Sequence, residues 1–312
     1  MKTFKLPGTK LTVPAIVAGM MRIAKMSDQD IRKLVSAAIA DGIYFFDHAD
    51  IYGGESHTCE GRFGNALKLT TSQRESLILQ TKCGIVRGEK HSTFDFSYEH
   101  ILEAVDGSLK ALRTDYIDIL LLHRPDALME PDEVAKAFDT LHHAGKVNHF
   151  GVSNFTPGQI RLLKQSIRQP LVANQVQISL THCPAIAQGL TANMSWLDES
   201  VDRDCGLLDY CRRLGITLQA WSPFQNPDWT GTFVGNPEQP ELNAVLDRLA
   251  AEYQVTPTAI ATAWITRHPA KMQVVTGTTD PVRLHQIALG SEVVLTRKEW
   301  YELFQAAGYT IP

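Results

Sequence analysis

A regular alternation between short, unbroken apolar runs and longer segments with helical periodicity constrains the fold of this chain more than any other feature. Strands that are buried on both faces read as continuous apolar runs, and helices between such runs are typical of parallel sheets. Eight runs follow one another along the chain: Ala15–Ala18, Tyr44–Phe46, Leu77–Gln80, Ile117–Leu122, His149–Val152, Leu171–Val176, Thr217–Ala220 and Gln273–Val275. Because a helical segment follows each run, the pattern predicts an α/β fold, a (β/α)₈ TIM barrel.

The connections add detail to this barrel. Residues 4–6 and 11–13 flank a turn that contains Pro and Gly, which predicts an N-terminal β-hairpin capping one end of the barrel. Two connections are long, residues 182–200 after the sixth strand and residues 223–239 after the seventh. Long loops at such positions usually shape the active site of a barrel. No linker-like segment divides the chain, so we expect a single domain over residues 1–312.

Helix start signals accompany several of the helical segments. The segment Ser27-Asp28-Gln29-Asp30 reads as a capping box, in which the first and last side chains each bond the backbone N–H of the other residue. Pro131 is typical of the first helical position, and Thr156-Pro157 reads as a cap followed by such a proline. A last helix is expected near residues 298–307.

Composition narrows the class of protein. The 30 Lys and Arg residues against 34 Asp and Glu give a net charge of −4 without a block of like charge, which gives no case for nucleic acid or an anionic membrane surface. We see no secretory signal and no run of ~18 to 20 apolar residues that would cross a bilayer. The five scattered cysteines favour reduced thiols, and His142-His143 and His182-Cys183 lack the partners of a metal site. We therefore expect a cytoplasmic protein that uses no metal.

Four polar side chains follow the second, third and fourth apolar runs. Asp47 and Tyr52 follow the second run, Lys82 the third and His123 the fourth, and the carboxyl ends of barrel strands share one face. Taken singly, the aspartate reads as a cap, the lysine as a solvated cation and the histidine as a core residue. Together they favour acid–base chemistry on a carbonyl group.

The chemical logic assigns one role to each of these groups. A tyrosine with its usual pKa of about 10 is a weak acid near neutral pH, and a neighbouring ammonium is expected to lower that pKa. Asp47 would hold Lys82 in its charged form, and His123 would donate to the carbonyl oxygen of the substrate. Tyr52 would then protonate that oxygen as a hydride reaches the carbon.

The residues that carry this chemistry lie in motifs of a known family. The motifs are GIYFFDHADIYG from Gly42, Thr81-Lys82, DILLLHRPD from Asp118, Gly145-Lys146-Val147 and GVSNF from Gly151. On these motifs the chain resembles the aldo-keto reductases over nearly its whole length, and in particular a bacterial oxidoreductase branch with HADIYGG and HRPD. The resemblance implies NADPH-dependent reduction of an aldehyde or ketone to an alcohol. It also implies a catalytic tetrad at Asp47, Tyr52, Lys82 and His123.

The chain carries no G-x-G-x-x-G after an expected strand, so a Rossmann site is not supported. The resemblance instead implies a dinucleotide across the mouth of the barrel. Ser153, Asn154 and Gln175 match residues that hydrogen-bond the nicotinamide carboxamide, and amide side chains both donate and accept. Trp221 matches the aromatic residue that stacks on the nicotinamide ring, and Ser222 is a candidate for the pyrophosphate. Ordinary strand-end capping and a core tryptophan are the alternative interpretations.

The phosphate end of the cofactor is assigned by the segment Thr276–Arg283, which matches the adenosine-phosphate segment of the family. A helix amino end favours anions, and a bidentate contact from Arg283 to a 2′-phosphate favours NADP(H) over NAD(H). A surface arginine without a ligand is the alternative. Many members carry a lysine at the position of Gly277 and an asparagine at the position of Ile287. The remaining cofactor candidates are Gly19, Met20, Thr278, Thr279 and Gln286, with Met21 and Arg22 as further candidates for the pocket wall.

Two other functions use the same residues. One is an NADP-binding sensor or regulatory subunit with little turnover, similar to the channel-associated members of the family. The other is an aldolase on the same barrel that forms a Schiff base with Lys82. For the reductase, the expected partner is a small carbonyl compound or alcohol. No pattern in the sequence identifies this compound or an oligomeric state.

Overall fold

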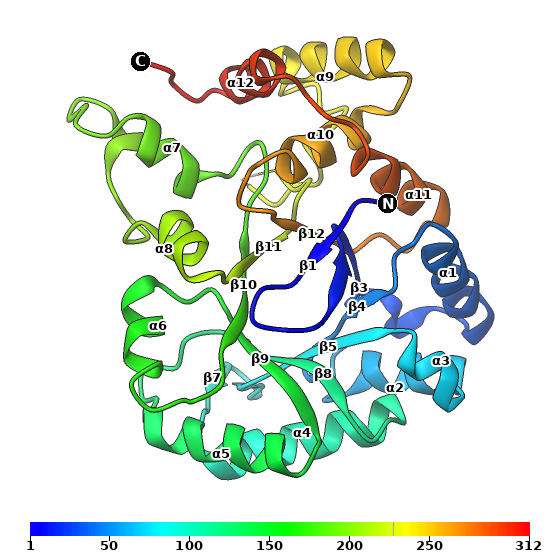
Figure 1. The fold of residues 1–312 in the computed structure, drawn as a ribbon. Coiled ribbons are helices and arrows are strands. Elements are labelled where there is room, and N and C mark those ends of the chain that lie inside the picture. Colours follow the sequence, from blue (N-terminus) through cyan, green and yellow to red (C-terminus); the bar gives the residue numbers. More distant parts are fainter. Residues whose placement is uncertain (227) are drawn as a thin grey trace.

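A computed structural model describes residues 1–226 and 228–312, so Pro227 of the loop 223–239 lies outside the described residues. The chain forms a closed parallel barrel inside a ring of helices (Figure 1). Eight strands of the described chain make up this barrel: β3 (Ile16–Gly19), β4 (Phe45–Asp47), β5 (Ile78–Cys83), β8 (Ile117–Leu122), β9 (Val147–Ser153), β10 (Leu171–Gln177), β11 (Thr217–Trp221) and β12 (Gln273–Thr276). They pair in the order β10-β11-β12-β3-β4-β5-β8-β9. The predicted TIM barrel is confirmed, and each strand overlaps one predicted run.

Two strand ends differ from the prediction in a way that matters for the site. β5 extends to Cys83 and β4 includes Asp47, so Asp47 and Lys82 lie within strands, whereas the sequence placed them just beyond the strand ends. Lys82 pairs with Leu121 in the ladder to β8. A polar residue does not end a strand when its side chain finds polar partners inside the barrel. His123 does follow its strand directly, as predicted.

The N-terminal hairpin closes one end of the barrel. β1 (Thr3–Lys5) and β2 (Thr12–Pro14) pair antiparallel, within a residue or two of the expected ranges, and they lie across the barrel in Figure 1. Leu6 and Val13 are fully buried and pack on the apolar side chains at that end of the barrel interior, which include Phe45. The hairpin therefore plugs the amino-terminal end and leaves the carboxyl end of the strands for the site.

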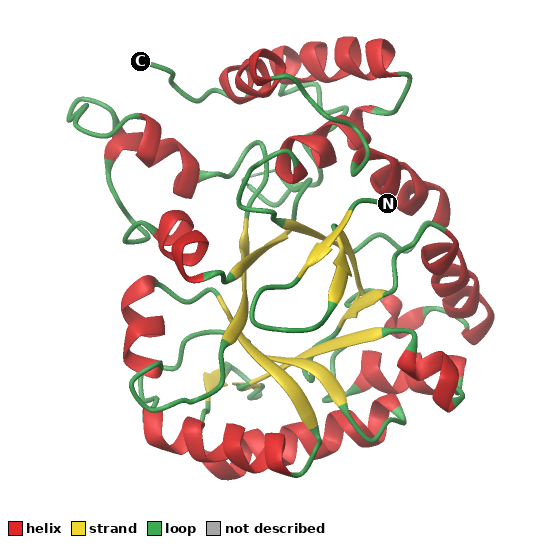
Figure 2. Cartoon of the chain, in the orientation of Figure 1, coloured by secondary structure: helices red, strands yellow, loops and turns green. Residues whose placement is uncertain are grey.

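Helices surround the strands on the outside (Figure 2). They are α1 (Asp28–Ala40), α2 (Thr58–Leu67), α3 (Thr71–Glu75), α4 (Tyr98–Leu112), α5 (Pro131–His143), α6 (Pro157–Leu163), α7 (Pro184–Leu190), α8 (Leu207–Leu214), α9 (Pro240–Tyr253), α10 (Pro257–Thr266), α11 (Pro281–Gly290) and α12 (Arg297–Ala306). Their apolar faces and the outer faces of the strands form the main hydrophobic core. None of the described helices is long and apolar enough to cross a membrane.

The start signals hold with one correction. Thr156 caps α6 with a complete capping box, and Pro131 is the first residue of α5. Ser27 caps α1 by accepting from the backbone N–H of Asp30. The predicted capping box is only half formed there, because the Asp30 carboxylate accepts from the Ser27 hydroxyl at 2.7 Å. The shorter aspartate side chain is engaged before it reaches the backbone.

The long connections carry structure that the sequence did not indicate. The connection after β10 contains α7 and a short 3₁₀ helix at Asp198–Ser200. A small hairpin of β6 (Ile85–Val86) and β7 (Thr93–Phe94) follows β5. Two-residue strands have no readable alternation, so the pattern of apolar residues could not predict this hairpin. The assignment of the whole chain to one domain stays a prediction.

Candidate active site

Lys82 is the centre of a buried polar corner at the carboxyl end of the barrel. Its side chain is fully buried on β5. Its ammonium donates to Asp47 Oδ2 at 2.6 Å, to the His48 carbonyl at 2.8 Å and to Tyr52 Oη at 3.1 Å. An ammonium has three hydrogens, so each one has an acceptor. Burial disfavours the charge, but Asp47 and Tyr52 outweigh it and raise the pKa of Lys82. Lys82 is therefore a fixed cation.

A chain of glutamine amides holds the Asp47 carboxylate from below. Asp47 Oδ1 accepts from the amides of Gln80 at 2.6 Å and Gln175 at 3.1 Å. Both amides also donate to Gln219, which donates in turn to Gln273 at 3.0 Å. The Gln273 amide donates to the carbonyl of Pro14 in the N-terminal hairpin at 2.8 Å. Both carboxylate oxygens therefore have donors, and the carboxylate has one orientation.

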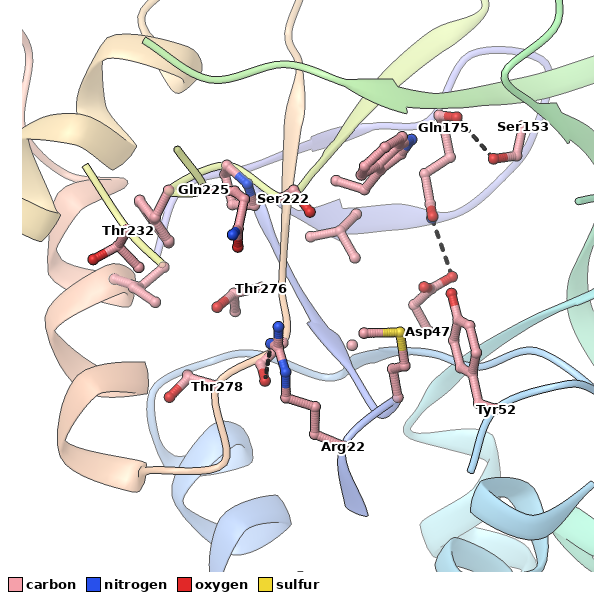
Figure 3. A pocket seen from close by; sticks show the side chains of 18 of the residues that line it. Arg22, Asp47, Tyr52, Ser153, Gln175, Ser222, Gln225, Thr232, Thr276 and Thr278 are labelled. Atoms are coloured by element: carbon pink, nitrogen blue, oxygen red, sulfur yellow. Dashed lines mark hydrogen bonds between the residues drawn. The ribbon is translucent and has the colours of Figure 1, made fainter. Parts of the chain in front are cut away.

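Tyr52 lies in the loop after β4, beside Asp47 (Figure 3). Burial raises the pKa of the Tyr52 phenol above 10, and the opposing effect of the Lys82 ammonium is smaller. Lys82 acts in the predicted direction, but the net lowering of the Tyr52 pKa that we expected does not occur, because burial outweighs it. The sequence shows which charge lies nearby, but it does not show how completely the phenol is removed from water. At neutral pH the phenol keeps its proton.

His123 completes the corner at the end of β8. Its ring meets the Tyr52 ring edge-on, with the centroids 5.7 Å apart and an angle of 82°. Burial, assisted by the charges of Lys82 and Arg124, lowers the pKa of His123 well below 6.5. A neutral imidazole carries one N–H donor. Nδ1 is buried and has no partner among the described residues, so the ring nitrogen that can donate to a ligand in the cavity is Nε2.

Asp47, Tyr52 and His123 line a cavity of about 340 Å³ at the mouth of the barrel (Figure 3), whereas Lys82 lies behind them and is not among its described lining residues. Most of the predicted cofactor residues line it: Gly19, Ser153, Asn154, Gln175, Trp221, Ser222, Gly277, Thr278 and Arg283. Met20, Thr279 and Gln286 are not among the lining residues of the described chain. Met20 is fully buried, and its N–H donates to the Asp47 carbonyl at 2.9 Å. Met20 therefore stabilises the end of β4 and does not line the cavity.

One wall of the cavity is a flat aromatic ring held by amide groups. Trp221 Nε1 donates to Asn154 Oδ1 at 3.0 Å, and the Asn154 amide donates to Ser153 Oγ at 2.9 Å. A second aromatic ring beside it is Trp229 from the loop 223–239, whose centroid lies 5.8 Å from that of Trp221 at an interplanar angle of 29°. The loop was predicted to shape the site, and Trp229, one of its aromatic residues, lines the cavity. The wall offers a stacking surface beside fixed polar groups.

Two arginines also line the cavity, near the segment between β12 and α11. Arg22 donates to the Gly277 carbonyl at 3.0 Å, and Arg283 lies in the first turn of α11 on the same cavity. A Cβ atom on Gly277 would lie 2.6 Å from Arg22 Nη1. Arg22 therefore fills the space that a lysine at position 277 would need. The flat wall, the amides and two cations at a helix amino end fit a nicotinamide dinucleotide.

A second polar cluster lies behind the tetrad. Glu60 on α2 is fully buried and accepts from His57 Nδ1 at 2.6 Å, from Ser108 at 3.1 Å and from Thr81 at 2.5 Å. Burial, and next the Glu60 charge, raise the pKa of Asp50 to about 7. Asp50 lies in the loop after β4 and is buried there, which no pattern in the sequence shows. The cluster ties the Tyr52 loop to β5 and α4.

The barrel and the tetrad geometry together define a class, the barrel oxidoreductases that bind a nicotinamide dinucleotide at the carboxyl ends of the strands. The model of the aldo/keto reductase family matches residues 15–307. The chain is 35% identical over 308 residues to the uncharacterized oxidoreductase YcsN of Bacillus subtilis, covering 95% of both chains. It is also 35% identical to a 6-dehydroglucose reductase of Agrobacterium fabrum, covering 96% of this chain and 95% of that protein.

A solved structure agrees on the fold. The crystal structure of a thermostable aldo-keto reductase with the inhibitor epalrestat matches 98% of this chain and 100% of its own, with a TM-score of 0.77 and 24% identity. The chain belongs to the aldo/keto reductase family, as the sequence predicted, and it is an NAD(P)-dependent oxidoreductase.

Proposed function

We propose that this protein reduces an aldehyde or ketone to an alcohol with NADPH, and that Tyr52 is the general acid. The observation that carries the proposal is the 3.1 Å contact in which the Lys82 ammonium donates to the Tyr52 oxygen. Because the ammonium is the donor, the phenolic hydrogen remains available for a substrate oxygen. A bound nicotinamide dinucleotide would supply the hydride.

The raised pKa of Tyr52 is compatible with this role. The phenol stays protonated at neutral pH, as an acid must before the reaction. Once the proton has moved, the Lys82 ammonium stabilises the phenolate, and this charge is already in place before the reaction begins. Asp47 holds the ammonium at 2.6 Å. The neutral His123 ring offers one N–H to the carbonyl oxygen and orients it.

The preference for NADPH is proposed from the two arginines at the start of α11. Arg22 and Arg283 both line the cavity beside Gly277 and Thr278. A 2′-phosphate is a strong acceptor for guanidinium groups, and NADH lacks it. Arg22 would replace the lysine that many family members carry at the position of Gly277.

The contacts of Lys82 disfavour the aldolase reading. A Schiff-base lysine must attack as a neutral amine. The Lys82 ammonium is fully buried, has an acceptor for every hydrogen, and has a raised pKa. Its role in the reductase, in contrast, needs this fixed charge.

The experiment is a comparison of wild type and Tyr52→Phe. NADPH oxidation is followed with a panel of aldehydes and ketones, and NADPH and NADH binding is followed by fluorescence titration. We expect kcat to fall by about three orders of magnitude or more, within the range that acid catalysis and its electrostatic support supply, while NADPH binding stays within a few-fold. Tyr44→Phe, at the other end of the barrel, is the matched control.

The outcomes separate the candidate functions. If Tyr52→Phe reduces carbonyls as fast as wild type, the acid assignment is wrong. If wild type binds NADPH tightly but turns over nothing in the panel, the sensor reading replaces the reductase. Trapping of a covalent adduct by borohydride at Lys82 would favour the aldolase.

A further inference from the structure

Arg124, like Arg283, lines the cavity without a described protein group that neutralises it, but it lies on a different segment, the loop after β8. It follows His123 directly, is exposed, and lines the same cavity as Tyr52. In the part of the chain that the structure describes, its guanidinium has neither a carboxylate within ion-pair distance nor a hydrogen-bond acceptor. An arginine at the wall of an active site without a protein partner is available to a ligand.

The acidic residue nearest in sequence does not serve Arg124. Asp126 Oδ2 accepts from the backbone N–H of Phe96 at 3.1 Å, and Oδ1 accepts from that of Leu128 at 2.8 Å. Asp126 therefore stabilises the loop after β8. The guanidinium of Arg124 is left without a matching charge.

The aromatic wall positions this guanidinium. Its central carbon lies 5.7 Å from the ring centroid of Trp221, within the range of cation–π contacts. Trp221 is itself fixed by its bond to Asn154 and by the neighbouring Trp229 ring. A cation–π contact does not use up the N–H groups, so they remain for an acceptor.

The charges around the cavity do not balance. Arg22, Arg124 and Arg283 line it against one carboxylate, Asp47, which is already paired inside the barrel. Arg22 and Arg283 stand beside the β12–α11 segment, where the cofactor phosphates are proposed to bind. Arg124 comes from the β8 loop next to His123. One positive charge at the substrate end therefore has no partner in the protein or in the proposed cofactor.

We propose that Arg124 binds an anionic group of the substrate, so that the preferred substrates are aldehydes or ketones that carry a carboxylate, phosphate or sulfonate. The proposal rests on the proposed reductase function and names its substrate class. The planar guanidinium fork matches such groups bidentately. Because His123 and Arg124 are adjacent, one small molecule places its carbonyl oxygen at Tyr52 and His123 and its anionic group at Arg124.

The test compares matched pairs of substrates at saturating NADPH: succinate semialdehyde with butanal, and glyceraldehyde phosphate with glyceraldehyde. Wild type is expected to prefer the anionic member in kcat/KM by at least about tenfold, as a charge-assisted hydrogen bond provides. Arg124→Gln brings this ratio close to one. Arg124→Lys keeps part of it, because it retains the charge but not the fork. Arg168→Gln removes the same charge from an exposed site before β10 and keeps the ratio.

Binding of butyrate to the NADPH-saturated protein, measured by calorimetry, gives a readout without turnover. Arg124→Gln is expected to weaken it by roughly tenfold. The proposal is overturned if wild type prefers the anionic member of neither pair, or if Arg124→Gln leaves both the ratio and the butyrate affinity unchanged. If no aldehyde is reduced but Arg124→Gln weakens butyrate, the anion site stands and the reductase function fails.

Discussion

The positive charges of the site fall into two regions with opposite character. In the buried corner, Lys82 is fully buried and each of its hydrogens has a protein acceptor. On the rim, Arg22, Arg124 and Arg283 are exposed, and among their described contacts only Arg22 donates to the protein, at the Gly277 carbonyl. The charge proposed for chemistry is fixed before any ligand arrives. The charges proposed for binding have no counter-charge among the described residues, and a ligand would supply it.

The two regions should therefore respond differently to substitution. Removing one partner of a buried pair leaves an uncompensated charge and typically costs about 3–5 kcal/mol. Removing an exposed guanidinium loses its contacts to the ligand, typically about 1.5–3 kcal/mol for hydrogen bonds to charged groups. Substitutions in the buried corner should therefore abolish activity, whereas substitutions on the rim should weaken ligand binding by degrees.

Lys82→Met should have the largest effect. It leaves the Asp47 carboxylate buried without its cation and Tyr52 without the ammonium that stabilises its phenolate. We expect kcat to fall by about three orders of magnitude or more, with a loss of stability of about 3–5 kcal/mol. Steady-state kinetics and denaturant unfolding measure both. Lys33→Met, at an exposed ion pair, is the control; a kcat within tenfold of wild type for Lys82→Met would remove the contrast between the regions.

Asp50→Asn should come next, and its effect depends on pH. The pKa of Asp50 is raised to about 7, so between about pH 4 and 7 the unfolded chain ionises this carboxyl before the folded chain does. The neutral side chain stabilises the fold at low pH, and that contribution is lost as the pH rises through 7. The isosteric amide does not titrate and should gain up to roughly 4 kcal/mol over wild type at pH 8, with little difference at pH 4. Unfolding at both pH values measures the gain, and an equal difference at each pH would contradict it.

Arg283→Ala and Arg22→Ala should each weaken NADPH binding by about tenfold or more, since each would remove a proposed charge-assisted contact to the 2′-phosphate. NADH affinity should change much less. Fluorescence titration with both dinucleotides gives the two ratios. Equal losses for NADPH and NADH would defeat the role of the 2′-phosphate and assign these arginines to the pyrophosphate.

Gly277→Ala should have the smallest effect. The new Cβ would lie 2.6 Å from Arg22 Nη1, at the far end of a flexible side chain that can move. We expect NADPH to weaken only a few-fold, in the same direction as Arg22→Ala. In the double variant the alanine at 277 should add nothing further, because the guanidinium that it displaces is already gone. Independent losses would show that Gly277 acts on the cofactor without Arg22.

The sequence predicted the barrel, and it predicted that four polar residues would lie together, because both predictions depend on periodicity. Apolar runs locate the strands, and parallel strands deliver whatever follows them to one face. Asp47, Tyr52, Lys82 and His123 lie together for this reason, although their catalytic roles stay a proposal. The strand ends at Asp47 and Lys82 were misplaced because a polar residue inside a barrel looks like the end of an apolar run.

What the sequence could not show depends on contacts between distant segments. The raised pKa of Tyr52 follows from burial, which no local pattern reports. Arg22 and Gly277 are 255 residues apart, so their shared space is visible only in three dimensions. Gln219 and Gln273 were read as parts of apolar strands, and their bonds to one another have no signature in the sequence. The sequence signal for these bonds was the presence of a polar residue inside an apolar run, since a buried polar side chain needs a hydrogen-bond partner.

The amide chain that begins at Asp47 ends at the carbonyl of Pro14 in the N-terminal hairpin. The hairpin thus supports the Asp47 carboxylate as well as closing the barrel, although it lies at the opposite end of the barrel from the cavity. Deleting the first fourteen residues would release the lower end of this chain and loosen the orientation of the carboxylate that holds Lys82. The expected consequence of this deletion is a lower kcat.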